Sequence, residues 1–221
     1  MYILHSYSSA IIFCVITMIC WGSWANTQKF NSKEWRFELY YWDYGLGVFL
    51  SAILLAFTLG STGAEGRSFI EDLSQADQNN LHSAIIGGIL FNIANILLVA
   101  AIGIAGMAVA FPVGIGLALV VGVVTNYLDN PAGNLSIISM GVLLIVAAII
   151  LNALAYKDIL GQAKGSKGLI LSLVAGSLMG FFYKYVATSM AQNFAQPEVG
   201  KLSPYTALVM FSVGLLASNF V

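Results

Sequence analysis

The chain has 221 residues, of which 59% are hydrophobic and only 9% are charged, and its net charge at pH 7 is −1. A soluble globular domain carries about 25% charged residues, so this composition excludes a typical soluble domain and indicates a polytopic membrane protein in contact with lipid. No basic run is long enough to bind nucleic acid, which is therefore not an expected partner.

Seven apolar runs are long enough to cross a membrane as helices, so the predicted fold class is all-α. They occupy Ser9–Gln28, Tyr44–Gly60, Ser83–Gly106, Met107–Tyr127, Leu135–Tyr156, Gly168–Gln192 and Pro204–Val221. No polar linker separates the third run from the fourth, so we expect a tight hairpin at Gly103–Gly106, where glycine supplies the turn.

The first run changes character where two aromatic rings and an amide follow each other, at Trp21, Trp24 and Asn26. An amide in hydrocarbon costs several kcal/mol unless it finds a partner or lines a wet cavity. The two tryptophans are three residues apart and share a helix face. They either pack against other helices or stack on a planar or sugar-like solute, and the neighbouring amide favours a solute site.

The connection before the second run places Trp35, Leu39 and Trp42 on one face of a segment that we expect in the lipid headgroup layer. Asp43 follows, at the expected start of the second span. It either caps that helix, which is the simpler interpretation, or acts as the proton-carrying carboxylate of a symporter. Further on, Ser68 and Glu71 have the spacing of a capping box and predict a short surface helix.

Asn92 and Asn95 are three residues apart in the third run, so both amides point to one face of the helix. They either form hydrogen bonds between helices or line the path of a solute.

Pro112 lies early in the fourth run, where it frees a carbonyl group and is expected to kink the helix. Two sets of small residues predict close helix packing: Gly114, Ala118 and Gly122 in the fourth run, and Gly176 and Gly180 in the sixth.

Lys184 is the charged residue that lies well inside an apolar run. Its ammonium group either reaches the membrane interface along its flexible stem or contacts a solute in a cavity.

Basic residues in short loops mark the cytoplasmic side of a membrane protein. The odd-numbered connections contain Lys29, Lys33, Arg36, Lys157, Lys164 and Lys167, and the even-numbered ones contain Arg67 and Lys201. This bias predicts an N-terminus outside the cell.

An internal repeat emerges when the chain is shifted so that Trp21–Asn26 aligns with Met179–Lys184. The same shift aligns the second run with the seventh. An odd number of spans separates the copies, so they have opposite orientations, as in the inverted repeats of secondary transporters. We therefore expect a first five-helix repeat at 1–156, a cytoplasmic linker at 157–167 and the start of a second repeat at 168–221. The chain is then expected to be the N-terminal part of a longer protein.

Catalytic and metal-binding patterns are missing from the sequence. His5 and His82 stand at the edges of spans without a second ligand at metal spacing, and no nucleophile motif or phosphate-binding loop occurs. We expect neither an enzyme nor a cofactor or metal site.

Four segments resemble a known group of transporters. They are CWGSWANTQK at 20–29, WRFELYYWDYGLGVFLSAILLAFTLG at 35–60, VAFPVGIGLALVVG at 109–122 and VVTNYLDNPAG at 123–133. They look like the sugar and ureide permease branch of the drug/metabolite transporter superfamily, which includes glucose/ribose porters, the rhamnose–proton symporter and plant ureide permeases. The resemblance implies a ten-span, 5+5 inverted-repeat fold in the plasma membrane that moves a small polar metabolite, often with a proton.

The sequence thus predicts a secondary active permease for a sugar-like or ureide-like solute, coupled to protons and working by alternating access. An exporter of the same superfamily and a non-transporting membrane scaffold or sensor are the alternatives. The expected solute contacts are Trp21, Trp24, Asn26, Asn92, Asn95 and Lys184, with Asp43 as the proton carrier.

Overall fold

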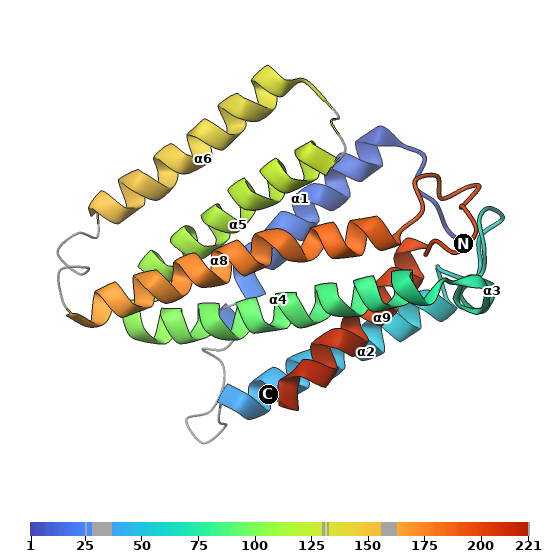
Figure 1. Ribbon diagram of the computed structural model, residues 1–221, viewed down its shortest axis with the longest axis horizontal. Helices are drawn as coiled ribbons and strands as arrows, with labels where there is room; N and C mark the ends of the chain where they lie inside the picture. Colours follow the sequence, from blue (N-terminus) through green and yellow to red (C-terminus); the bar gives the residue numbers. More distant parts are fainter. Residues whose placement is uncertain (25, 28–36, 130, 132, 156–162, 221) are drawn as a thin grey trace. The chain divides into compact units, whose positions relative to one another are not determined.

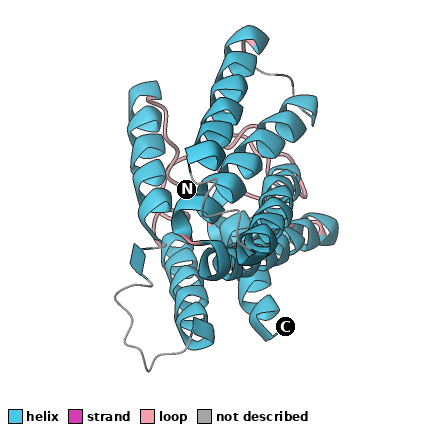
Figure 2. Cartoon of the chain, turned by 90° about the vertical axis from the view of Figure 1, so that its left-hand side faces the viewer, coloured by secondary structure: helices cyan, strands magenta, loops and turns pink. Residues whose placement is uncertain are grey.

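The structure is a computed structural model that describes residues 1–24, 26–27, 37–129, 131, 133–155 and 163–220. Figure 2 shows helices joined by loops, and these residues contain no strand. The helices are α1 (Tyr7–Ser23), α2 (Phe37–Phe57), α3 (Phe69–Gln75), α4 (Gln78–Ala105), α5 (Met107–Asp129), α6 (Leu135–Ala155), α8 (Ala163–Ser189), α9 (Pro204–Ala217) and the 3₁₀ helix η2 (Ser218–Phe220).

Each of the seven predicted spans coincides with an apolar helix, and five of these helices are long and apolar enough to cross a membrane. These five are α2, α4, α5, α6 and α8, whereas α1 and α9 are shorter apolar helices. The α-helix of α1 ends at Ser23, five residues before the predicted end of the first span at Gln28. The composition therefore identifies a membrane protein correctly, while the two terminal apolar helices are shorter than a candidate span.

The start of α2 corrects a second prediction. The helix begins at Phe37, so Leu39 and Trp42 lie within its first turns and not in a separate surface segment. Trp35 is outside the described residues, as are four of the basic residues used to predict the orientation, namely Lys29, Lys33, Arg36 and Lys157. The orientation of the N-terminus stays a prediction.

The described chain forms two compact units. Unit 1 comprises Met1–Leu81 and Met190–Val221, and unit 2 comprises His82–Ser189. These units reflect contacts between helices, whereas the predicted repeat boundaries reflect internal sequence similarity. The division into two units does not test the inverted repeat, which stays a prediction.

Unit 2 is held together by α5 and α8, which lie side by side along their length (Figure 1). A Cβ atom on Gly176 would collide with the carbonyl oxygen of Gly114, and one on Gly180 would lie 2.5 Å from Val121 Cβ. Helices in lipid gain little from burying apolar surface against each other, so close backbone approach at small residues drives their association. The predicted small-residue ridge is confirmed as the contact between these two helices.

The hairpin between α4 and α5 turns at a single residue. Gly106 has a φ of 84°, in the left-handed region that glycine adopts without strain, and it separates α4 from α5. Its N–H donates to the carbonyl oxygen of Ile102 at 2.9 Å, which closes the C-terminal end of α4. The predicted tight hairpin is confirmed.

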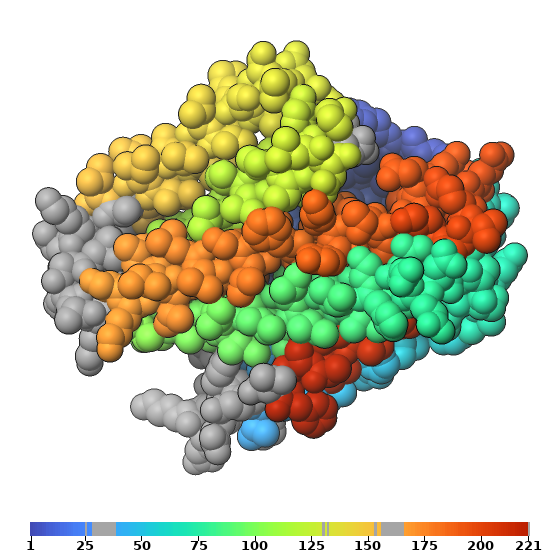
Figure 3. All heavy atoms as spheres, viewed as in Figure 1, coloured from blue at the N-terminus to red at the C-terminus, as the bar shows by residue number. Residues whose placement is uncertain are grey.

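The fifth predicted span, α6, packs against α5 at the surface of unit 2. Ile149 of α6 lies so close to Gly116 of α5 that a Cβ there would be 2.6 Å from Ile149 Cδ1. None of the apolar window Leu135–Asn152 is buried, and Figure 3 shows α6 (yellow) on the outer surface of unit 2. Its apolar side chains therefore suit contact with lipid or another membrane helix.

Unit 1 pairs α2 with α9 around small residues. Ala52 and Ala56 of α2 are buried against Val209 of α9 and Phe69 of α3. Gly45 lies where a Cβ would be 3.2 Å from Leu215 Cδ2. The ring of Phe57 meets that of Phe69 edge to face at 5.1 Å, which attaches α3 to the end of α2.

A polar clasp joins the α2–α4 connection to the α8–α9 connection within unit 1. Arg67 Nε donates to Asp72 Oδ1 at 2.9 Å, and its Nη2 donates to the carbonyl oxygen of Lys201 at 2.7 Å. The backbone N–H of Ser203 donates to Asp72 Oδ2 at 2.7 Å. Asp72 is completely buried, so these bonds compensate the carboxylate for lost hydration.

The predicted capping box at the start of α3 is also present, because the backbone N–H of Ser68 donates to a carboxylate oxygen of Glu71.

The N-terminal residues contact the connection that carries the clasp, within unit 1. The backbone N–H of Tyr2 donates to the carbonyl oxygen of Leu59 at 2.6 Å, and the Met1 amino group donates to that of Glu65. Two predicted spans separate these partners in sequence, and four separate the two connections that the clasp joins. Segments on one side of a membrane must be separated by an even number of crossings. The seven-span order itself stays a prediction beside the five candidate spans.

We predict that Gly176→Ala lowers the melting temperature of the detergent-solubilised protein, because the added methyl group collides with the backbone of α5. The cost should be roughly 1–3 kcal/mol, as for other overpacked sites. Gly141→Ala in α6 is the matched control, since nothing lies within 4 Å of a Cβ there. Equal melting temperatures for the two variants would contradict the α5–α8 packing.

Candidate functional site

The predicted site residues divide evenly between the two units. Unit 1 contains Trp21, Trp24, Asn26 and Asp43, whereas unit 2 contains Asn92, Asn95, Pro112 and Lys184. Each group is described within its own unit.

The two amides of α4 are buried in unit 2, with exposed fractions of 0% for Asn92 and 1% for Asn95. Their shared face also carries the buried Phe91 and Leu98, so it points to the protein interior. Among the described residues, the buried Oδ1 atom of Asn95 has no hydrogen-bond donor. A buried unpaired acceptor costs about 1–3 kcal/mol. This orphan oxygen favours a ligand-binding role for Asn95 over a simple bond between helices.

Lys184 has a partner that sequence reasoning did not identify. Its Nζ atom lies 2.9 Å from Asp129 Oδ1, and the two side chains are 43% and 38% exposed. Asp129 is the last residue of α5, and 55 positions separate it from Lys184 of α8. The sequence did not predict this contact, because an acidic residue at a helix end is common. Only the packing of α5 on α8 brings Asp129 and Lys184 together. The ion pair fixes where the Lys184 ammonium group lies.

Pro112 lies inside α5, which continues as an α-helix from Met107 to Asp129. Because proline has no N–H, it cannot donate to the carbonyl group four residues earlier, at Ala108. Val109, Ala110 and Val113 beside it are buried. The kink at Pro112 stays a prediction.

In unit 1, Trp24 directly follows α1 and stacks on Tyr44 of α2, with ring centroids 5.7 Å apart and an interplanar angle of 29°. Tyr41 meets Tyr44 at 5.5 Å. The indole Nε1 of Trp24 is buried and finds no acceptor within the described ranges. Trp21 is half-buried in the last turn of α1, and Asn26 is exposed. Trp24 is thus the member of the predicted aromatic pair with a defined aromatic partner and an unmet donor.

Asp43 is not a helix cap. Because α2 begins at Phe37, Asp43 lies in its second turn and within the candidate membrane span Leu39–Phe57. A cap residue precedes the first turn, and the dipole effect falls off within that turn. The capping interpretation of Asp43 is therefore wrong. A carboxylate within a span is a functional candidate by default, which leaves the proton-carrier hypothesis in place.

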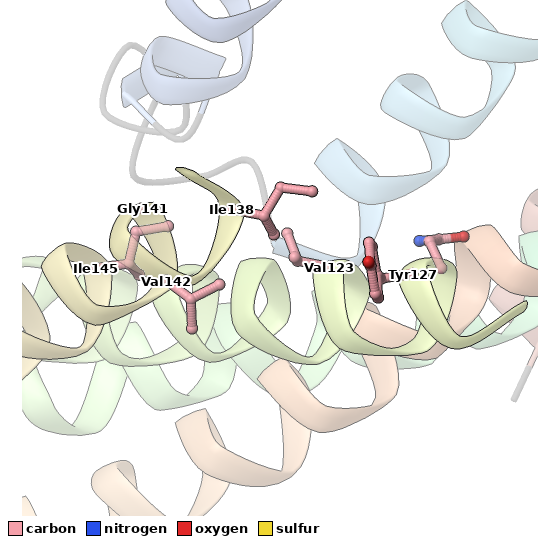
Figure 4. Close-up of a pocket in the computed structure, with 7 residues that line it drawn as sticks. Val123, Tyr127, Ile138, Gly141, Val142 and Ile145 are labelled. Carbon is pink, nitrogen blue, oxygen red and sulfur yellow. The ribbon is translucent and has the colours of Figure 1, made fainter. Parts of the chain in front are cut away.

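Each unit also contains a groove on its surface. One lies between α5 and α6 in unit 2, has a volume of about 410 Å³ and is lined by Val123, Asn126, Tyr127, Ile138, Gly141, Val142 and Ile145 (Figure 4). Its Asn126 amide donates to the carbonyl oxygen of Gly122 at 2.7 Å, so that group is engaged by its own helix.

The second groove follows α2 in unit 1 and has a volume of about 430 Å³. It contains Tyr44 and Ser51, which sequence reasoning missed. Tyrosine and serine are too common in membrane helices to stand out, and the only sequence signal is their seven-residue spacing on one helix face. In the part of the chain that the structure describes, no three His, Cys, Asp or Glu side chains gather as metal ligands.

Five membrane-length helices, one carrying a buried amide pair and another a carboxylate, define a multi-pass membrane protein with polar groups inside its spans. A profile of the Ureide permease family matches residues 40–167, more than half of the chain. The protein belongs to the ureide permease family. The family part of the resemblance is confirmed, and the match contains Asp43, Asn92, Asn95 and Pro112.

Individual relatives agree with the family match. Ureide permease 5 of Arabidopsis thaliana is 28% identical over 174 residues, which is 76% of this chain and 42% of the relative. Ureide permease 1 of the same plant is 26% identical over 160 residues, or 72% of this chain and 41% of the relative. The chain therefore spans less than half the length of these curated relatives. No solved structure matches it.

We predict that Lys184→Gln and Asp129→Asn each change the free energy of unfolding by at most about 1 kcal/mol, because the ion pair is exposed. The measurement is thermal unfolding in detergent, with Glu65→Gln, which breaks the exposed His5–Glu65 pair, as the control. A loss of several kcal/mol would show that the Lys184–Asp129 pair is desolvated and holds unit 2 together. A small loss makes both variants suitable for transport assays.

Proposed function

We propose that the chain belongs to a secondary transporter that carries a ureide or a similar small polar solute across the plasma membrane, and that it is not an enzyme. Membership of the ureide permease family over residues 40–167 is the observation that carries this proposal. The relatives that match are named ureide permeases, and the match extends through the helices α2, α4, α5 and α6.

The amide pair of α4 supports a polar solute. Asn95 presents a buried carbonyl oxygen that receives no hydrogen bond from the described residues, and such a group is tolerated inside a membrane protein where it meets a ligand or water. A ureide supplies N–H groups and a sugar supplies hydroxyl groups, so either class can donate to Asn95. In this proposal the residues that contact or shape the solute site are Trp21, Trp24, Asn26, Asn92, Asn95 and Lys184.

Alternating access follows from the predicted inverted repeat. In such transporters the two repeats rock around a site near the middle of the membrane. The proposed repeats are 1–156 and the segment starting at 168, joined by 157–167, in the 5+5 arrangement of the drug/metabolite transporter superfamily. The N-terminus would lie outside the cell.

Proton coupling is assigned to Asp43. Its position in the second turn of α2 puts a carboxylate within a membrane span, where a carboxylate can bind and release a proton during the transport cycle. Exchange of the bound proton would then accompany movement of the solute.

The decisive test is counterflow in proteoliposomes of the full-length protein, with labelled ureides and monosaccharides as probes. We predict saturable counterflow of a ureide, and a roughly tenfold loss of kcat/KM in Asn95→Leu, because the solute loses a hydrogen bond in a water-poor site. Asn126→Leu is the matched control, since the Asn126 amide bonds to its own helix. Saturable counterflow that is unchanged in Asn95→Leu would remove Asn95 from the site. Silence across the panel would move the assignment to an exporter or a membrane scaffold.

We further predict that Asp43→Asn abolishes the stimulation of uptake by an inward proton gradient while counterflow continues. An amide does not titrate, so net proton movement stops, but solute exchange needs no net proton movement. The measurement compares uptake with and without a pH gradient, and Glu65→Gln, outside the spans, serves as control. Gradient-driven uptake that survives in Asp43→Asn would exclude Asp43 as the proton carrier.

A further inference from the structure

The groove along α2 has the features of a binding subsite within unit 1. It has a volume of about 430 Å³, and its lining includes Tyr44, Gly47, Val48, Ser51, Leu55 and Leu208. Small-molecule sites typically have volumes of about 300–1,000 Å³ and combine apolar walls with a few polar groups. Tyr44, Val48, Ser51 and Leu55 recur every three or four residues, so they form one stripe along the helix.

Among the described residues, two hydroxyl groups of this groove and the indole that stacks on Tyr44 have no hydrogen-bond partner. Within the described residues, neither the Tyr44 hydroxyl group nor the Ser51 hydroxyl group forms a hydrogen bond, and Trp24 Nε1 is buried without an acceptor. Other hydroxyl groups in these helices do bond to their own backbone. Thr17 donates to the carbonyl oxygen of Phe13 at 2.8 Å, and Thr58 donates to that of Leu54 at 2.6 Å. The Ser51 hydroxyl group therefore remains available to a ligand.

An aromatic surface stands at one end of the stripe. Trp24 stacks on Tyr44, which itself lines the groove, so the indole lies beside the Tyr44 end of the groove. Two stacked rings present a flat face that suits a planar ring. Ser51 lies seven residues further along α2, which corresponds to about 10 Å of helix rise. Tyr44 and Ser51 thus mark out a groove about as long as a small ring-bearing metabolite with a polar tail.

The unpaired donors decide between possible occupants. A lipid acyl chain or an apolar helix face would fill the volume but would leave the buried Trp24 Nε1 unmet, at a cost of roughly 1–3 kcal/mol, and would offer no acceptor to the two hydroxyl groups. A planar solute with several carbonyl oxygens would accept from these donors and stack on the aromatic surface. Two hydroxyl donors in an otherwise apolar wall therefore favour a ligand that carries carbonyl groups.

We propose that Trp24, Tyr44 and Ser51 form a subsite that binds the carbonyl oxygens of a small planar solute along α2. This assignment rests on the proposed transport function and adds Tyr44 and Ser51 as residues that determine specificity.

The test uses Trp24→Phe, Tyr44→Phe and Ser51→Ala in the full-length protein, because each change removes a donor and keeps most of the side chain's volume. The probe is labelled allantoin, a ureide with a five-membered ring and several carbonyl groups. We expect each variant to raise the KM of counterflow roughly three- to tenfold, as expected for one lost hydrogen bond, with an unchanged melting temperature. Tyr7→Phe and Thr17→Val are the controls, since Tyr7 is 81% exposed and Thr17 bonds to its own helix.

A second measurement separates this proposal from the transport function. Millimolar allantoin should raise the melting temperature of the wild-type protein, and this shift should disappear in the triple variant, because a ligand that binds only the folded state stabilises it. Ligand-induced stabilisation without counterflow would support the subsite and overturn the transport assignment. Counterflow with a KM that is unchanged in all three variants would overturn the subsite and leave transport standing. Absence of both signals would overturn both.

Discussion

Close backbone contact between α5 and α8 is the constraint on which unit 2 depends. Gly114 faces Gly176, and Gly180 faces Val121, at separations that leave no room for a Cβ atom. In lipid, dispersion forces between tightly fitted helices replace the hydrophobic effect that assembles soluble proteins. The same contact brings Asp129 of α5 to Lys184 of α8. The position of the Lys184 ammonium group therefore depends on the glycines that let the two helices approach closely.

The sequence predicted those parts of the fold that depend on local patterns. Hydropathy located seven apolar helices, glycine located the α4–α5 turn at Gly106, and the Ser68–Glu71 spacing located the start of α3. Predictions failed where the same local pattern is compatible with two different structures. The aromatic segment before Asp43 has the periodicity of an interfacial helix, but its residues from Phe37 onward continue directly into α2. This continuation moved Asp43 from a helix end into a span.

The candidate site was predictable where a residue type is unusual for a membrane. Asn92 and Asn95 stood out because amides are costly in hydrocarbon, and their burial agrees with that reasoning. Asp129, Tyr44 and Ser51 did not stand out, because their importance depends on neighbours from other helices and on hydrogen bonds that are not made. Asp72 is the clearest case. Its carboxylate is buried and accepts from Arg67, five residues away, and from the backbone N–H of Ser203, 131 residues away, and no local pattern predicts this second contact.

The clasp also has a consequence for the order in which the protein is assembled. Unit 2 is a continuous stretch, His82–Ser189, so all of its packing partners are present once residue 189 has left the ribosome. Unit 1 is discontinuous, because Asp72 waits for the backbone of Ser203 and α2 waits for α9. Parts of a chain generally fold as units in the order of their synthesis. The helices made first are therefore completed last, and until then a buried carboxylate and its arginine are held without the carbonyl and N–H groups that satisfy them. Such an intermediate would be a natural substrate for the chaperones and proteases that survey newly made membrane proteins.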